Sequence, residues 1–273
     1  MKFSELIYPL SIENFFRDYW GKQHLHLSGK ISLLETITYD DVIKEIISSD
    51  FFKMKYIRSS GYQKLNEVAQ VMKKEDQRYI YSKQELMDSM NNGRSIIVNH
   101  LQFLLNQDGP FLNLLYDFAS VVNCPKERFQ LACFITPENG QAFLPHIDNN
   151  ETFTIQIQGT KKWRLYHFDD NYDRGKNSVK NNVFTEINMQ VGDFLYVPRF
   201  LIHEVIATDC KTYSASGIFK ATTQGEEILR KLDESVTYLY GQRKQFKMSY
   251  NPFNDKNLSI NLEDLYKIQQ LKS

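Results

Sequence analysis

FLPHIDNNETFTIQIQGTKKWRLYHF, residues 143–168, is the stretch of the sequence that decides the fold. It holds a His-x-Asp pair, an alternating apolar and polar run, a Gly-Thr turn and a second run. Alternation of this kind predicts two β-strands joined by a two-residue hairpin with glycine first. His146 and Asp148 stand two residues apart, so on a β-strand their side chains leave the same face. One imidazole and one carboxylate are two members of the facial triad that holds non-haem Fe(II).

The third member of the triad is predicted at His203, in the segment VGDFLYVPRFLIHEVI, residues 191–206. The pattern indicates a turn, a buried strand, a break at Pro198 and a new strand that begins near His203. Such a bend can bring the new strand back beside an earlier one, so that His203 faces the upstream pair. A lone His-x-Asp, or a lone histidine in an apolar run, is more often an ordinary structural feature. The prediction of a metal site therefore depends on the occurrence of the His-x-Asp pair and His203 together, with the hairpin and its lysine between them.

A buried cation is predicted on the second strand of the hairpin. Lys161 follows the turn directly and Lys162 comes next, so alternation lets only one of them point into a barrel. An inward ammonium needs an anion, because burying it unpaired is costly. The distal carboxylate of 2-oxoglutarate would be such an anion, while its 2-oxo acid end and dioxygen would occupy the positions that a facial triad leaves open. The alternative is that both lysines are exposed turn residues.

The remaining pattern predicts a mainly β fold with flanking helices. Short apolar runs broken by Gly, Pro and Asn-rich turns predict strands at 128–135, 152–158, 161–168, 184–190, 194–197, 202–207 and 212–219. So many short strands with tight connections favour a sandwich or barrel. Helices are predicted at 11–20, 40–49, 82–93, 110–122, 225–240 and 262–271, with an exposed loop at 169–182. We expect an N-terminal segment that packs on and extends the barrel (1–127), a barrel core (128–220) and a C-terminal helical segment (221–273).

The composition of the 273 residues is that of a globular protein, with 42% hydrophobic and 24% charged residues. Lys plus Arg equals Asp plus Glu at 33 each, and this balance gives no general attraction to nucleic acid or to an acidic membrane. The three cysteines are widely spaced and odd in number, which favours reduced thiols. No apolar run approaches the ~20 residues that span a bilayer, and residues 1–20 lack the features of a signal peptide. These features predict a cytoplasmic location and no membrane association.

Two segments, TPENGQAFLPHIDNNETFTIQIQGTKKWRLY and GDFLYVPRFLIHEVIA, resemble the JmjC and cupin-like 2-oxoglutarate oxygenases. The most similar branch is that of the ribosomal oxygenases (cupin-4) and related bacterial hydroxylases. FFRDYWGKQHLHL resembles the entry segment of that branch, so the resemblance covers about residues 10–30 and 128–220. It implies a double-stranded β-helix, or jelly-roll, core.

The resemblance also implies roles for single residues. By it, His146, Asp148 and His203 bind Fe(II) and form the catalytic centre. Lys161 matches the lysine with which the family's asparaginyl hydroxylase binds the distal carboxylate of the co-substrate. Similar ribosomal oxygenases tend to have arginine there, and lysine gives a point charge in place of a two-pronged clamp. Further candidates for the co-substrate pocket are Thr152, Ser214 and Ser216.

The implied activity is that of a dioxygenase that uses Fe(II), 2-oxoglutarate and O2, releases succinate and CO2, and hydroxylates a side chain of a protein or peptide. The chain after Lys220 is too short for the dimerisation and winged-helix regions of ribosomal oxygenases together, so the substrate is not carried over. The amphipathic pattern of the terminal helices leaves a homodimer contact open.

Three alternatives remain open. A JmjC-type hydroxylase of a modified tRNA base is allowed by basic residues at 174–180 and 243–244, although the neutral net charge disfavours it. A non-enzymatic metal-binding cupin module is disfavoured because all three ligands are present. A zinc or manganese hydrolase or isomerase would need further ligands, and Glu204, next to His203, points to the opposite face of its strand.

Overall fold

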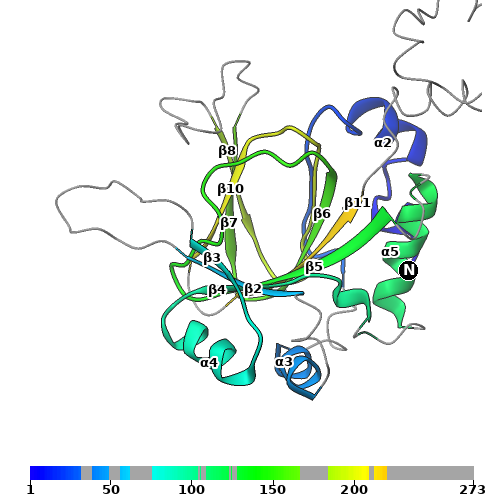
Figure 1. Cartoon of the computed structure of the whole chain (residues 1–273). Coiled ribbons are helices and arrows are strands. Elements are labelled where there is room, and N and C mark those ends of the chain that lie inside the picture. Colours follow the sequence, from blue (N-terminus) through cyan, green and yellow to red (C-terminus); the bar gives the residue numbers. More distant parts are fainter. Residues whose placement is uncertain are drawn as a thin grey trace, which may run out of the picture. The chain divides into compact units, whose positions relative to one another are not determined.

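The computed structural model describes residues 1–31, 39–48, 56–61, 76–103, 105, 109–122, 124, 128–166, 184–208 and 212–219 (Figure 1). The chain divides into two compact units, Met1–Ala221 and Thr222–Ser273. All described residues belong to the first unit. The loop predicted at 169–182, the helices predicted at 225–240 and 262–271, and the homodimer contact attributed to terminal helices lie outside the described residues.

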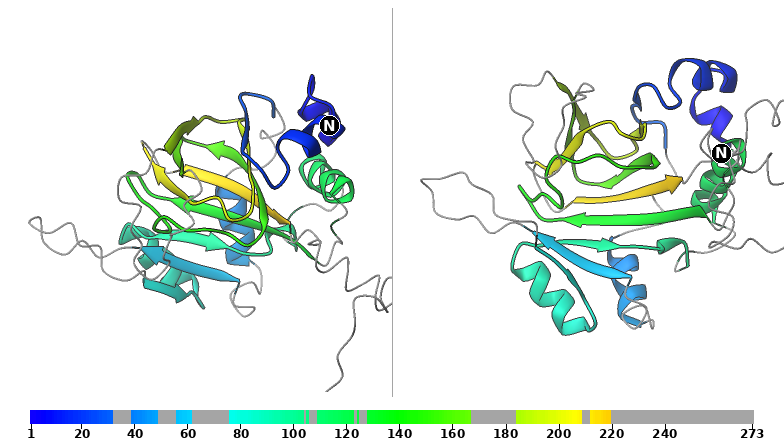
Figure 2. Two further views of the ribbon diagram at one scale, coloured as in Figure 1. Left: turned by 90° about the horizontal axis from the view of Figure 1, so that it is seen from above. Right: turned by 45° about the horizontal axis from the view of Figure 1, so that its top comes forward.

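Two antiparallel sheets form the core of the first unit. Its strands are β1 (Leu25–Leu27), β2 (Ile57–Gly61), β3 (Asp76–Tyr79), β4 (Ser95–Val98), β5 (Phe129–Thr136), β6 (Glu151–Gln158), β7 (Lys161–Tyr166), β8 (Phe184–Met189), β9 (Phe194–Val197), β10 (His203–Ala207) and β11 (Thr212–Phe219). The large sheet has the order β1-β9-β6-β11-β5-β4-β2-β3, and the small sheet has the order β10-β7-β8. The small sheet stands over one face of the large sheet (Figures 1 and 2), which confirms the predicted jelly-roll class and the seven strands predicted after residue 127.

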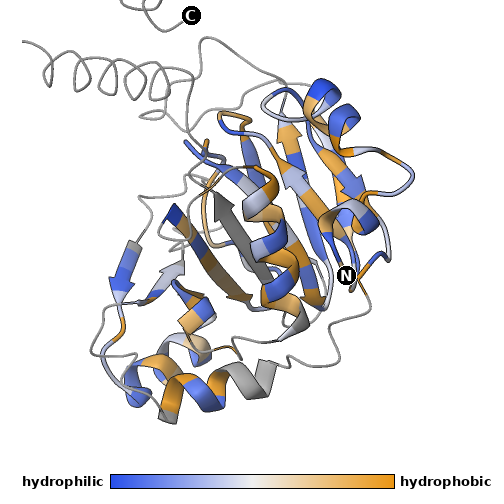
Figure 3. Cartoon of the chain, turned by 90° about the vertical axis from the view of Figure 1, so that its right-hand side faces the viewer, coloured by the Kyte–Doolittle hydropathy of each residue, from blue (hydrophilic) through white to orange (hydrophobic). Residues whose placement is uncertain are grey.

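The hairpin of β6 and β7 connects the two sheets. It turns at Gly159, whose φ of 67° lies in the left-handed region that glycine adopts without strain. β6 is bonded to β9 on one side and to β11 on the other, so it lies inside the large sheet. Its alternation sends Phe153 to the outer, helix-covered face and Thr152 and Thr154 to the inner face, which looks toward the small sheet. Figure 3 shows such alternation as apolar and polar bands along the strands.

Helices cover the outer face of the large sheet (Figures 1 and 2). They are α1 (Phe3–Leu6), α2 (Ile12–Asp18), α3 (Tyr39–Ser48), α4 (Lys83–Asn91) and α5 (Pro110–Val121), with a 3-10 turn at η3 (Leu101–Phe103). An aromatic cluster fills the space beneath α1, α2 and α5. The rings of Phe118 and Phe153 lie 3.9 Å apart between centroids, and Phe3 lies 4.2 Å from Phe118. This cluster belongs to the larger of two apolar cores.

Serine side chains cap the N-termini of α2 and α4. Ser11 Oγ accepts a hydrogen bond from Asn14 N, and Ser82 Oγ accepts one from Glu85 N. The Glu85 carboxylate does not close a capping box on Ser82, because it accepts from Tyr81 N at 2.7 Å. No helix in the described part of the chain combines the length and the apolar character that crossing a membrane requires.

Strands β2 and β3 were not predicted. Their sequences, IRSSG and DQRY, are mostly polar and lack a clear alternation. They extend the large sheet beyond β4, where α3 and α4 lie below them in Figure 1. Their polar residues are held in the sheet by backbone pairing, which a count of apolar positions does not detect.

Candidate active site

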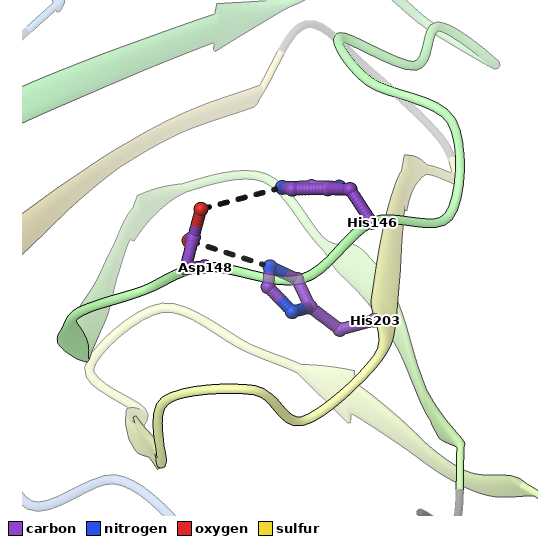
Figure 4. Close-up of side chains that lie close together, drawn as sticks. All are labelled: His146, Asp148 and His203. Atoms are coloured by element: carbon purple, nitrogen blue, oxygen red, sulfur yellow. Dashed lines mark ion pairs between the residues drawn. The ribbon is translucent and has the colours of Figure 1, made fainter. Parts of the chain in front are cut away.

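The structure brings His146, Asp148 and His203 together (Figure 4). One potential ligand atom from each residue lies within 4.8 Å of the other two. The Asp148 carboxylate lies 4.0 Å from His146 Nε2 and 3.8 Å from His203 Nε2. Among the described residues, no other group of His, Cys, Asp and Glu side chains is arranged to hold a metal ion in this way.

Backbone hydrogen bonds place the three side chains. His146 and His203 form an isolated antiparallel bridge, in which His146 N donates to His203 O at 3.0 Å and His203 N donates to His146 O at 2.9 Å. Asp148 O accepts from Phe200 N at 2.8 Å, and Phe200 has a φ of 67°. The expectation that His146 and Asp148 lie on a strand is therefore wrong. Both residues precede β6. Their side chains are oriented by the bridge to His203 and by the hydrogen bond from the bend before β10, and not by strand alternation.

The hydrogen bonds of the two imidazoles suit metal binding. His146 Nδ1 lies 2.8 Å from Leu144 O, and His203 Nδ1 lies 2.9 Å from Leu201 O. A carbonyl only accepts, so each Nδ1 carries a proton and Nε2, on the side of Asp148, is the nitrogen left for a metal. Two imidazoles that direct Nε2 toward one carboxylate fit a divalent ion of the Fe(II) type.

Aromatic rings wall the histidines. Trp163 stacks on His203, with centroids 5.6 Å apart and planes at 21°, and Phe143 meets His146 edge-on at 5.2 Å. Neither ring was predicted from the sequence to be part of the site. Strand alternation could have predicted the orientation of Trp163, because it stands two residues after Lys161 on the same strand and so shares its inward face. Both rings line the pocket beside the histidines.

Lys161 points inward and is 2% exposed. Its Nζ donates to Ser214 Oγ at 2.8 Å and to Phe134 O at 3.1 Å. Burial lowers the pKa of Lys161 to about 7, and no described carboxylate pairs with it. Lys162 points outward, where its Nζ lies 3.2 Å from Glu186. The structure thus selects one lysine of the pair, as alternation required.

One pocket of about 190 Å³ contains both the His-Asp-His group and Lys161. His203 pairs with Leu165 on β7, and Lys161 lies four residues before Leu165 on the same strand. The backbone of Lys161 is therefore roughly 13 Å from that of Leu165 at ~3.3 Å per residue. Thr152 also lines the pocket, and its buried Oγ1 has no hydrogen-bond partner in the described structure.

Two further residues considered from the sequence are Ser216 and Glu204. Ser216 pairs through its backbone with Ala132 and Thr154, while its side chain lies outside the described part of the structure. Glu204 lies on the other face of β10, as expected, and accepts from Tyr166 Oη at 2.6 Å.

The same pocket has a side that sequence reasoning missed. Arg58 on β2 and Asn99 at the end of β4 line it, together with Ile97 and Ala142. Nothing in the sequence marked Arg58, because it is a lone cation in a polar segment. It reaches the pocket only because β2 extends the large sheet.

Residues 114–226 match the family model described as JmjC domain. Among curated relatives, the bifunctional lysine-specific demethylase and histidyl-hydroxylase NO66 of Dictyostelium discoideum is 28% identical over 222 residues, which are 74% of this chain and 39% of the relative. NO66 of Drosophila erecta is 35% identical over 82 residues, which are 27% of this chain and 12% of the relative. The chain therefore spans less than half the length of these relatives.

Among solved structures, YcfD, a ribosomal oxygenase from Escherichia coli, is similar over 97% of this chain and 66% of YcfD, with a TM-score of 0.59 and 18% identity. YcfD in complex with cobalt and 2-oxoglutarate matches 95% of this chain and 65% of YcfD, with a TM-score of 0.57 and 18% identity. At this level of identity the likeness establishes a shared fold.

Proposed function

We propose that the chain is a 2-oxoglutarate- and Fe(II)-dependent oxygenase that hydroxylates a side chain of a protein or peptide, a proposal supported by the match of residues 114–226 to the JmjC domain model. The observation that carries the proposal is that one pocket holds the His146, Asp148 and His203 group and a buried Lys161 with no carboxylate partner among the described residues. The reaction consumes O2 and 2-oxoglutarate and releases succinate and CO2. Residues 128–220 form the catalytic core in this proposal, and 1–127 and 221–273 flank it.

His146 and His203 would bind iron through Nε2, and Asp148 would bind it through a carboxylate oxygen. Iron supplies the activation of dioxygen, a reaction for which no amino-acid side chain is suited. The protein holds the ligands in place. The carbonyls of Leu144 and Leu201 fix the tautomer of each imidazole, and the ring of Trp163 fixes the plane of His203.

Lys161 would bind the distal carboxylate of 2-oxoglutarate. An ammonium group with no anion is costly to bury, and a bound carboxylate would offset that cost and restore the protonated form. Ser214 Oγ and the Phe134 carbonyl hold Nζ in position before the anion arrives. The orphaned hydroxyl of Thr152 would donate to an oxygen of the co-substrate. Ser216 on β11 remains a further candidate for this role.

A protein or peptide substrate is proposed from the relatives. NO66 is named for action on lysine and histidine residues, and YcfD is a ribosomal oxygenase. These activities belong to those proteins, and the lysine and histidine in the name of NO66 are protein side chains, which supports a protein or peptide substrate here. The pocket proposed here holds a side chain, not a whole macromolecule, which agrees with a volume of about 190 Å³.

The test is to measure binding and turnover separately. Purified protein with Mn(II) in place of iron and without O2 should bind 2-oxoglutarate in calorimetry. With Fe(II) and O2 it should form succinate, and peptide products should gain one oxygen in mass spectrometry. Iron-loaded protein that neither binds 2-oxoglutarate nor forms succinate would contradict the proposal.

A further inference from the structure

We propose that Arg58 and Asn99 form the substrate-binding side of the pocket and bind a substrate side chain that ends in a carboxylate or a carboxamide. The inference rests on the proposed oxygenase function and names the class of residue on which it acts. Aspartate, asparagine, glutamate and glutamine belong to this class, while arginine and lysine are excluded.

Arg58 is separated from the co-substrate end of the pocket. It pairs with Ile97 on β4, which pairs with Phe134 on β5, the residue whose carbonyl accepts from Lys161. Arg58 therefore starts two strands away from Phe134, roughly 10 Å at ~4.8 Å per strand. Lys161 reaches the Phe134 carbonyl from β7 in the small sheet, whereas Arg58 stands on β2 of the large sheet, so the two cations of the pocket begin at separate points.

This side of the pocket offers hydrogen-bond donors. Arg58 Nη1 donates to Gln77 Oε1 at 3.0 Å, but its buried Nε has no partner among the described residues. Asn99 Oδ1 already accepts from Gln130 Nε2 at 2.9 Å, so its Nδ2 hydrogens are the part left for a ligand. A guanidinium and an amide N–H pair best with a group that accepts several hydrogen bonds, such as a carboxylate or an amide carbonyl.

The charges of the described lining agree with this assignment. Its charged residues are Arg58, Lys161 and Asp148. Asp148 is assigned to the metal, and Lys161 is assigned to the co-substrate, so neither balances Arg58. A cationic side chain entering here would meet like charge and no free carboxylate, which disfavours it. The apolar residues Ile97 and Phe143 also line the pocket and would pack against the aliphatic part of a bound neutral or anionic side chain.

The first experiment compares peptide pools that differ only in one fixed central residue, which is Asp, Asn, Glu, Gln, His, Arg or Lys, with randomised flanks. Succinate formation above the peptide-free rate is measured for each pool, and mass spectrometry locates the added oxygen. Carboxylate or carboxamide pools should give the largest stimulation, and the Arg and Lys pools should give none.

The second experiment uses variants of Arg58. Arg58→Gln should lower kcat/KM for the preferred pool about 10- to 100-fold, the range for loss of a charge-assisted hydrogen bond. Most of this change should appear in KM, and the affinity for 2-oxoglutarate measured with Mn(II) should stay unchanged. Arg58→Lys should restore part of the loss, and Arg58→Glu should shift the preference toward the Lys and Arg pools.

Arg94→Gln is the matched control, because Arg94 Nε donates to Ser59 Oγ on the opposite face of β2 and does not line the pocket. It should leave peptide preference unchanged. Stimulation mainly by the Arg or Lys pools, or by no pool in protein that binds 2-oxoglutarate, would overturn the inference. So would Arg58 variants that weaken 2-oxoglutarate binding without changing peptide preference. Wild-type protein that fails to bind 2-oxoglutarate would instead overturn the proposed function.

Discussion

The two faces of the large sheet come from the same strands but have opposite chemistry. On β6, Phe153 packs into an aromatic cluster with centroid distances of 3.9 Å to Phe118 and 5.0 Å to Tyr196. One residue away, Thr152 lines the pocket with a hydroxyl that has no hydrogen-bond partner among the described residues. The outer face thus gains stability from apolar burial, while the inner face holds polar groups that are costly to bury. We infer that the outer face stabilises the fold and that the inner face is adapted to its ligands.

Removal of a metal ligand should break the inner face most severely. His203→Ala should lower the affinity for Mn(II) or Fe(II) by well over about 100-fold, because even supporting residues around a metal site contribute 10- to 100-fold. Metal content and succinate formation are the measurements. His26→Ala, which removes a histidine bonded to Asp193 outside the pocket, is the control and should keep the metal. Equal metal content in both variants would count against the assigned ligands.

Truncation on the outer face should have the reverse effect. Phe153→Ala removes a ring that is 1% exposed and should lower the free energy of unfolding by about 3–5 kcal/mol. Urea denaturation measures this loss. The folded fraction should still bind one metal ion with the wild-type affinity, because Phe153 does not line the pocket. A specific loss of metal affinity would show that the two faces are not independent.

Lys161→Met should separate stability from function. In protein without co-substrate, the pKa of Lys161 is lowered from 10.5 to about 7. The burial of the protonated amine therefore lowers the free energy of unfolding most below pH 7, and this loss of stability disappears as pH rises toward 10.5. Methionine removes the cost, so the free energy of unfolding at pH 7 should rise by a few kcal/mol, with ~4 as the upper limit. The same variant should lose 2-oxoglutarate binding in calorimetry. A Lys161→Met protein less stable than the wild type would contradict the conclusion that burial of the Lys161 amine destabilises the fold.

The pH dependence of 2-oxoglutarate binding should follow from the same group. The anion binds the protonated amine, so affinity should be full below pH 7 and should fall up to tenfold per pH unit above it. Titrations of the Mn(II) protein at several pH values would measure the slope. Lys161→Arg should bind without this slope, because arginine stays protonated. If the affinity of Lys161→Arg for 2-oxoglutarate fell with pH as steeply as that of the wild type, the titrating group would be one other than Lys161.

The smallest effect is expected at Thr152. Thr152→Val keeps the shape but removes the unpaired hydroxyl, so stability should change by less than about 1 kcal/mol in either direction. The affinity for 2-oxoglutarate should fall by roughly 2- to 10-fold if the hydroxyl donates to it. Thr152→Ser should retain the wild-type affinity. Equal affinities in all three proteins would remove Thr152 from the co-substrate site.

Much of the site could be read from sequence because its residues have local signals. The Gly159-Thr160 turn fixes the hairpin, and alternation after it allows only one inward lysine, which is Lys161. His203 was predicted from the turn, strand and proline pattern that precedes it. Each of these signals depends on neighbours within a few residues, where chain geometry is nearly determined by the residue types.

The missed parts depend on distant partners. Arg58 enters the pocket through backbone pairing of β2 with β4, roughly forty residues away along the chain, which its own polar segment does not reveal. Asp148 is aimed by a hydrogen bond from Phe200 N and not by strand alternation. The aromatic wall of the site has the same origin, since the ring of Phe143 reaches His146 from an irregular segment.

The sequence by itself determined the strands after residue 127, the hairpin and the identities of His146, Asp148, His203 and Lys161, because periodicity and turn chemistry act locally. Only the tertiary structure decided how these groups meet. The bridge between His146 and His203 joins residues far apart in sequence, and Arg58 is carried to the pocket by pairing across the sheet. Such contacts form because strand pairing satisfies backbone hydrogen bonds and helix packing buries the outer apolar face. Both are requirements of the whole chain that no short segment expresses.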